Sequence, residues 1–196
     1  MDIRSTKTRR KLKDALKSLL MKYPFEKITI SDICEEAMIN RVTFYTHYHD
    51  KNEILEDSIR DIVLRIINPS LEEYIKNSDK ENAMVDLLKN ISSNSISQIY
   101  KYKDIIANFK RRESPSLLNA VRNVCNRESQ ALIIHVLSIS GAKYPEELLM
   151  AFLIGGVYKT IETSVFSNNH YSEDTIKDLA NKLIEGFMNS PLFFRK

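Results

Sequence analysis

The chain has 196 residues, 43% hydrophobic and 28% charged, which is the composition of a globular protein rather than a disordered one. Only four glycines and five prolines are available for the tight turns of an all-β fold, so helix is the favoured secondary structure. No run of about 18 apolar residues and no signal-peptide pattern occurs, which excludes a membrane span and leads us to expect a cytoplasmic protein.

The net charge of +3 is unevenly distributed along the chain. Residues 1–51 contain 11 Lys or Arg against 7 Asp or Glu, whereas residues 52–196 contain 18 against 19. Residues 1–22 alone carry 8 basic and 2 acidic side chains. A basic patch on one small domain is typical of nucleic-acid binders, although a solvated helix face has the same composition.

The two cysteines, Cys34 and Cys125, have neither zinc-ligand spacing nor the pattern of a secreted disulfide framework. We expect both to be buried as small hydrophobic residues. No metal site or cofactor is predicted.

The first predicted helix ends at Pro24. One apolar stripe at helical spacing consists of Leu12, Ala15, Leu16, Leu19, Leu20 and Tyr23. The opposite face carries Arg10, Lys13 and Lys17, which would make it the basic face of the domain.

Two short helices follow. Thr29 and Asp32 form a capping-box pattern at the start of the first. Asn40 is a suitable N-cap for the second, which we expect to run from Arg41 to Tyr48. Two short helices joined by a few residues are the outline of a helix-turn-helix.

A fourth helix is predicted to begin after Asp50, with Glu53 at the third position, and to end near Ile67 before Pro69. We expect Phe44 and Tyr48, four residues apart, to belong to the core of the N-terminal domain.

The segment around the second short helix is rich in both rings and polar groups, which suits the major groove of DNA. Arg41 and Thr43, near the helix N-terminus, can reach base edges. Tyr45 and His47 can donate hydrogen bonds to phosphate oxygens. Lys51 lies in the first turn of the next helix, where free backbone amides also attract a phosphate.

Residues 9–55 resemble the DNA-binding domain of the TetR family of one-component repressors. The motifs that carry the resemblance are Phe25-x-x-Ile28-Thr29-Ile30-x-x-Ile33, Ala37, Thr43-Phe44-Tyr45-x-His47-Tyr48 and Lys51-x-Glu53-Ile54-Leu55. The resemblance implies DNA contacts from Thr29, Asn40, Arg41, Thr43, Tyr45, His47 and Lys51.

Two positions depart from the family pattern. Met38 stands at a turn position often occupied by Gly, so we expect either a less comfortable backbone conformation at Met38 or an adjusted turn. Val42 replaces a small residue of the recognition helix, which suggests an apolar contact to a thymine methyl or a sugar.

The rest of the chain reads as helices throughout. Apolar residues recur at helical spacing in segments 70–77, 82–101, 103–112, 115–140, 145–167 and 173–189. Gly141 stands where a C-terminal cap belongs.

The last two helices predict a dimer. The helix at 145–167 is apolar on almost every face, with adjacent glycines in its middle, so it must be covered on both sides. In TetR-like proteins the last two helices pair with those of a second subunit. The residues we assign to this interface are Phe152, Gly155, Gly156, Leu179, Leu183 and Phe187.

The central helices would form an effector domain. By family analogy Tyr100, Phe109 and His135 would line its pocket, but the same residues suit an ordinary helical core. Part of the C-terminal region also resembles TetR-like proteins of low-GC Gram-positive bacteria, some of which act with protein partners. The effector could thus be a small molecule or a protein.

The sequence therefore predicts an all-α chain with a three-helix helix-turn-helix domain at 1–50 and a larger ligand and dimerisation domain at 51–196. We expect a homodimeric DNA-binding transcriptional regulator that binds a palindromic double-stranded operator, represses, and is released by an effector. No nucleophile with a base, paired carboxylates or metal motif indicates an enzyme. The rival hypothesis is a helical protein-interaction module without sequence-specific DNA binding.

Overall fold

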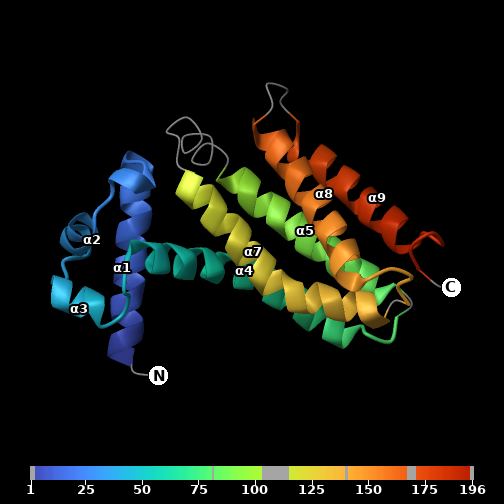
Figure 1. Cartoon of the computed structure of the whole chain (residues 1–196), viewed down its shortest axis with the longest axis horizontal. Helices are drawn as coiled ribbons and strands as arrows, with labels where there is room; N and C mark the ends of the chain where they lie inside the picture. The colour runs from blue at the N-terminus through green and yellow to red at the C-terminus, as the bar shows by residue number, and fades with distance from the viewer. Residues whose placement is uncertain (1–2, 81, 103–114, 140, 167–170, 195–196) are drawn as a thin grey trace. The chain divides into compact units, whose positions relative to one another are not determined.

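The computed structural model describes residues 3–80, 82–102, 115–139, 141–166 and 171–194 (Figure 1). Within these ranges every regular element is a helix, apart from one isolated bridge between Ala142 and Phe194. The chain divides into two compact units. One contains the residues up to Ile62 and the start of the helix that begins at Pro115; the other contains most of the remainder. The predicted all-α fold class is confirmed.

The first unit contains two short helices, a 3-10 turn, one long helix and parts of others. They are α1 (Ile3–Lys22), the 3-10 turn η1 (Phe25–Lys27), α2 (Ile30–Ala37), α3 (Arg41–Tyr45) and the first turns of α4 (Lys51–Lys76). Helix α2 packs against α1, and α3 follows α2 closely. Most of the predicted apolar stripe of α1 is buried, but Tyr23 at its end is 51% exposed. Predicted core residues Phe44 and Tyr48 are 0% and 2% exposed, as expected.

Helix α3 ends at Tyr45, three residues earlier than the sequence predicted. The backbone N–H of His47 donates to the carbonyl of Phe44 at 2.9 Å, a tighter turn than an α-helix makes. The turn tightens where the side chain of Tyr48 enters the core.

Met38 shapes the turn between α2 and α3. It has φ 54° and ψ 46° and is the one non-glycine residue with positive φ in the described part of the chain. Its N–H donates to the carbonyls of Cys34 and Glu35, which closes the end of α2. The side chain is 92% exposed, so its packing contributes little that would offset the strain of the left-handed conformation. The expected backbone conformation at this position is confirmed.

Helix α4 continues through Pro69 to Lys76, so the prediction of two helices at 50–67 and 70–77 was wrong. A proline within a helix lacks an N–H donor and its ring crowds the carbonyl four residues earlier, yet α4 continues past Pro69, which is exposed. The Ser70 hydroxyl donates to the carbonyl of Ile66 at 3.2 Å and supports the same turn.

The second unit packs its helices side by side. They are α5 (Ala83–Lys101), α8 (Glu146–Phe166) and α9 (Glu173–Met188), with parts of α4 and of α7 (Pro115–Ile139). Figure 1 shows α5 lying along α9, with α8 beside both. The core is a cluster of Leu87, Leu88, Leu149, Leu153, Ile184, Phe187, Met188 and Phe194. A smaller cluster contains Ile96, Ile161, Ile176 and Ala180.

The chain returns over this core at its C-terminal end. Phe193 stacks on Phe187 with ring centroids 4.8 Å apart, and Phe194 is 5% exposed. The N–H of Lys143 donates to the carbonyl of Phe193 at 2.8 Å, which fastens the returning segment to the start of α8. Gly141, the predicted cap, has φ 69°.

The other expected helices agree with α5, α7, α8 and α9 to within one or two residues. The helix predicted at 103–112 lies outside the described residues. Cys34 is buried as expected, whereas Cys125 is partly exposed. In the described part of the chain no helix is long and apolar enough to span a bilayer.

Replacing Met38 by glycine should stabilise the protein. A left-handed residue with a Cβ is strained, and glycine removes that strain, so we expect the free energy of unfolding to rise by about 0.5–1 kcal/mol. Met38→Ala is the matched control, because it removes the same exposed side chain and keeps the Cβ. Urea unfolding followed by circular dichroism measures both. A glycine variant no more stable than the alanine variant would contradict the strain.

Candidate nucleic-acid interface

Helix α3 has one buried and one exposed face. Phe44 is fully buried, with its ring 6.0 Å from that of Tyr48. On the opposite side Val42 is 75% exposed, Tyr45 is 55% exposed, and Arg41 is exposed as well. The buried aromatic ring therefore fixes the helix while three side chains of different chemistry point outward.

Side-chain caps hold both short helices at their N-termini. The Asn40 side-chain oxygen accepts the N–H of Thr43 at 2.7 Å, which caps α3. The Thr29 hydroxyl accepts the N–H of Asp32 at 3.2 Å, and the Asp32 carboxylate accepts the N–H of Thr29 at 2.8 Å. The hydrogen bonds from the Thr29 backbone and hydroxyl lower the pKa of Asp32. Both predicted caps are confirmed.

The predicted DNA-contacting residues share one region of the first unit. Thr29, Asn40 and Arg41 are exposed, whereas Thr43 and His47 are half-buried. The Arg41 guanidinium donates to the hydroxyl of Ser31, which ties the first residue of α3 to α2. DNA contacts from this set stay a prediction.

Lys51 has a structural task that sequence reasoning missed. Its ammonium donates to the carbonyls of Phe25 at 2.9 Å, Glu26 at 3.2 Å and Ile28 at 2.8 Å. It also lies 4.7 Å from the centre of the Phe25 ring. These bonds use all three N–H donors of the ammonium. In this arrangement the side chain joins the start of α4 to η1 and has no donor left for a phosphate.

A polar network joins α1, the segment after α3, and α4. The Lys13 ammonium lies 2.8 Å from the carboxylate of Asp57 and 2.7 Å from that of Asp61. The Tyr48 hydroxyl donates to the same Asp57 oxygen at 2.7 Å. Arg9 lies over the Tyr48 ring at 5.2 Å, and its guanidinium is 4.0 Å from Asp57.

Arg9 also reaches the predicted DNA-contacting segment, because its guanidinium donates to the carbonyl of His47 at 3.3 Å. The backbone of His47 is therefore held from α1.

The network keeps its charges at neutral pH. Burial alone would raise the pKa of Asp57, but Lys13, the Tyr48 hydroxyl and the charge of Arg9 together hold it below its usual value. Burial, aided by Asp57, raises the pKa of Tyr48 far above its usual value, so the phenol stays a donor. A charged acceptor surrounded by two cations and a neutral donor is a satisfied, partly buried site.

The sequence placed Lys13 on the basic face of α1 with Arg10 and Lys17, and the structure corrects this. The side chain of Lys13 is 17% exposed and faces the carboxylates of α4. Helical periodicity placed Lys13 opposite the apolar stripe, but it could not reveal a carboxylate 44 residues further along the chain. The signal that could have found the pair is the polar spacing of Asp57 and Asp61, one helical turn apart on α4.

In the second unit, α8 and α9 expose apolar side chains on their outer surface. Phe152 is 68%, Leu179 44% and Leu183 54% exposed, and all three belong to the predicted dimer interface. Gly155 and Gly156 are exposed, and a Cβ built on either would meet no atom within 4 Å. Phe187 differs from the prediction: it is 7% exposed and packs in the core.

The predicted effector residues are only partly described. Phe109 and the side chain of His135 lie outside the described residues. The Tyr100 hydroxyl donates to the carbonyl of Tyr171 at 3.1 Å, and Tyr100 packs against the smaller cluster of the second unit. In the part of the chain that the structure describes, no three His, Cys, Asp or Glu side chains are arranged to hold a metal ion.

Comparison with known proteins agrees with this geometry. Residues 12–57 match the family model of bacterial regulatory proteins of the tetR family. The chain is 34% identical over 98 residues to the uncharacterised HTH-type transcriptional regulator YxbF of Bacillus subtilis (strain 168). That match covers 47% of this chain and spans about a quarter (26%) of the length of the relative.

Solved structures show the same fold over nearly the whole chain. A TetR-family regulator from Syntrophomonas wolfei superposes with a TM-score of 0.73 at 11% identity, covering 94% of this chain and 96% of the other. A TetR regulator from Streptococcus agalactiae has a TM-score of 0.59 at 19% identity, with 92% and 95% covered. At these identities the likeness is one of fold.

Removing the charge of Asp57 should destabilise the protein in a pH-dependent way. Asp57→Asn should lower the free energy of unfolding at pH 7 by about 1–3 kcal/mol, the range for a hydrogen-bonded charged group. Because the pKa of Asp57 is lowered in the folded state, its contribution is complete above the unfolded pKa of about 3.9. It is lost as the pH falls through the lower folded value.

The stability difference between wild type and Asp57→Asn should thus be constant near neutral pH and shrink as the pH falls through the lowered folded pKa of Asp57. Asp14→Asn is the control, because the Arg10–Asp14 pair is 85% and 72% exposed and should change stability little. Urea unfolding at several pH values measures both. An equal loss in the two variants would contradict the network.

Proposed function

We propose that this chain, whose N-terminal domain is that of the TetR family of bacterial regulatory proteins, is a transcriptional regulator that binds double-stranded DNA as a homodimer. The observation that carries the proposal is the exposed face of α3, where Arg41, Val42 and Tyr45 are held outward by the buried ring of Phe44. Residues 1–50 carry the DNA contacts in this proposal. Residues 51–196 carry dimerisation and the response to an effector.

The contacts divide into two kinds. Arg41 and Thr43 read base edges in the major groove, with Val42 against a thymine methyl or a sugar. The hydroxyl of Tyr45, the ring of His47 and the N-terminus of α2 near Thr29 bind phosphate oxygens and set the register. Lys51 supports the same surface by fastening α4 to η1, since its donors are already used.

Dimerisation is supported by the outer face of α8 and α9. Exposed Phe152, Leu179 and Leu183 form an apolar surface of the kind that marks a protein interface. The open space above Gly155 and Gly156 lets a partner helix approach closely. A two-fold dimer would read a palindrome whose half-sites lie one helical turn, about 34–36 Å, apart.

An effector would act by favouring a dimer whose recognition helices are wrongly spaced. In the described part of the chain, the Ser92 hydroxyl of α5 is buried without a hydrogen-bond partner. This hydroxyl is the group of the second unit that an effector could bond. Release of the operator by this route would make the protein a repressor.

Selection of bound sequences from a random duplex library, at one fixed salt concentration, tests the proposal. We expect a palindrome with half-sites about ten base pairs apart. If DNA were retained without any consensus sequence and released as salt rises, sequence-specific regulation would be refuted. The helical interaction module would then be favoured.

On the selected operator, two substitutions should separate base reading from phosphate binding. Arg41→Ala should lower the ratio of operator to random-DNA affinity by about 5- to 100-fold, which corresponds to the loss of one base contact. Tyr45→Phe removes only a hydroxyl and should weaken binding to both duplexes equally. Fluorescence anisotropy at matched salt measures the ratio of operator to random-DNA affinity for each variant. If Arg41→Ala left this ratio unchanged, as Tyr45→Phe should, the division between base reading and phosphate binding would be wrong.

Gly156→Glu should convert dimers to monomers in sedimentation velocity. The added side chain has open space within its own protomer, so the fold should tolerate it while a buried, unpaired carboxylate would disrupt the interface. Asn68→Glu, on an exposed position of α4, introduces the same charge and should leave the dimer intact. A dimer that persists in Gly156→Glu at micromolar concentration would disprove this interface.

A further inference from the structure

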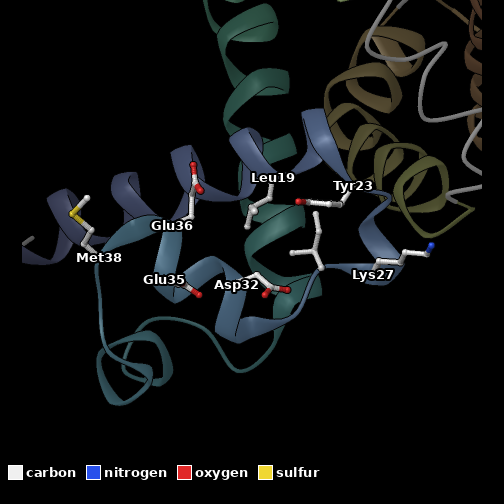
Figure 2. A pocket seen from close by; sticks show the side chains of 8 residues that line it. Leu19, Tyr23, Lys27, Asp32, Glu35, Glu36 and Met38 are labelled. Carbon is white, nitrogen blue, oxygen red and sulfur yellow. The ribbon is translucent and has the colours of Figure 1, made fainter.

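A groove on the first unit has no part in the predicted DNA contacts. It holds about 560 Å³ between the end of α1, η1 and α2. Its lining consists of Leu19, Tyr23, Lys27, Ile28, Asp32, Glu35, Glu36 and Met38. Figure 2 shows Leu19, near the end of α1, and Tyr23, just after it, on one side of the groove, with Asp32 of α2 on the other. None of these residues belongs to the set expected on DNA.

The groove is acidic within a basic domain. Its lining contains three carboxylates and one lysine. The Lys27 side chain points away from the middle of the groove, so its charge does not neutralise the centre (Figure 2). These carboxylates disfavour a phosphate backbone inside the groove itself.

The apolar part of the lining is unusually exposed. Tyr23 is 51% and Met38 92% exposed. Large apolar side chains rimmed by charged ones on one surface mark a protein-binding site. Met38 extends into solvent from a strained turn, so local packing does not account for its presence.

Arginine and lysine side chains fit such a surface. Their aliphatic stems pack on apolar side chains while their charged ends reach the surrounding carboxylates. The exposed ring of Tyr23 adds a cation–π site for one of them. Glu35 is exposed, and Glu36 accepts a hydrogen bond from Ser18 at 2.7 Å with its second oxygen still available for an ion pair.

We propose that this groove binds the basic start of α1, residues 3–11, of a second dimer of this chain. The segment reads IRSTKTRRK, and Arg4, Lys7, Arg10 and Lys11 are exposed on it. The positive excess of the whole chain is concentrated in residues 1–22, so this is the matching surface that the protein itself provides. The contact would make neighbouring dimers bind adjacent DNA sites cooperatively, a consequence that rests on the proposed function.

The first test needs no DNA. A fluorescent peptide of residues 3–11 is titrated with the full chain at low salt and anisotropy is measured. Glu35→Gln combined with Glu36→Gln should weaken peptide binding about fivefold or more, because two ion pairs are lost and the hydrogen-bonding shape is kept. Tyr23→Leu should weaken it about two- to fivefold through the lost cation–π contact.

The control is Glu72→Gln combined with Glu147→Gln, which removes two exposed carboxylates of the second unit. If both double variants weakened peptide binding equally, the attraction would be diffuse and the groove would not be the binding site. A peptide of the same residues in scrambled order that binds as tightly would overturn the second copy as the specific occupant. Circular dichroism confirms that each variant is folded.

The second test uses a duplex with two adjacent copies of the selected operator. The Glu35→Gln, Glu36→Gln variant should fill one isolated site normally but lose cooperative filling of two. Retained cooperativity in this variant would overturn the inference while the proposed function stands. If wild type did not bind even a single operator site, the proposed function would be refuted. The peptide titration would then still show whether the groove binds residues 3–11.

Discussion

The ion pair between Lys13 and Asp57 is the interaction on which the proposed DNA-binding unit depends. It brings α1 and α4 together at 2.8 Å, and the same carboxylate oxygen accepts the hydroxyl of Tyr48. Tyr48 in turn contacts the buried ring of Phe44, the anchor of α3. Because an unpaired carboxylate in this half-buried position would be unfavourable, the three elements can move apart only by giving up all of these contacts together. The network therefore fixes the exposed face of α3 relative to α1 and α4.

The basic residues of the N-terminal domain consequently have two distinct uses. Lys13 and Lys51 turn inward, one to carboxylates and the other to three carbonyl oxygens. Arg9 is shared between the Tyr48 ring and the backbone of His47. The positive charge that remains at the surface lies on exposed side chains of α1, on Lys27 and on Arg41. Net charge alone thus overstates how many cations the domain can offer to phosphates, since three of them hold the fold.

Sequence reasoning succeeded where a few neighbouring residues decide the structure. The caps at Thr29 and Asn40 follow from side-chain chemistry within four residues, and the structure has both. The uncomfortable backbone conformation of Met38 was expected only from the family pattern. Sequence reasoning failed where a partner lies far along the chain or where context overrides a local rule. Lys51 finds its acceptors 23 to 26 residues away, and Pro69 stays within α4 because its ring faces solvent and the rest of the helix is packed. The candidate base contacts depend on DNA, which the chain's own contacts do not specify.

Helix α4 begins in the first unit and continues into the second, with Pro69 inside it. Pro69 lacks an N–H, so the carbonyl of Arg65 has no helical partner and the helix is weakest there. A bend at this point would absorb any motion that entered α4 beyond it. Val63 and Ile67, however, are 9% and 7% exposed and belong to the second unit although they precede Pro69. The second unit therefore includes α4 from Val63 onward, so this helix joins the core of that unit before it reaches Pro69.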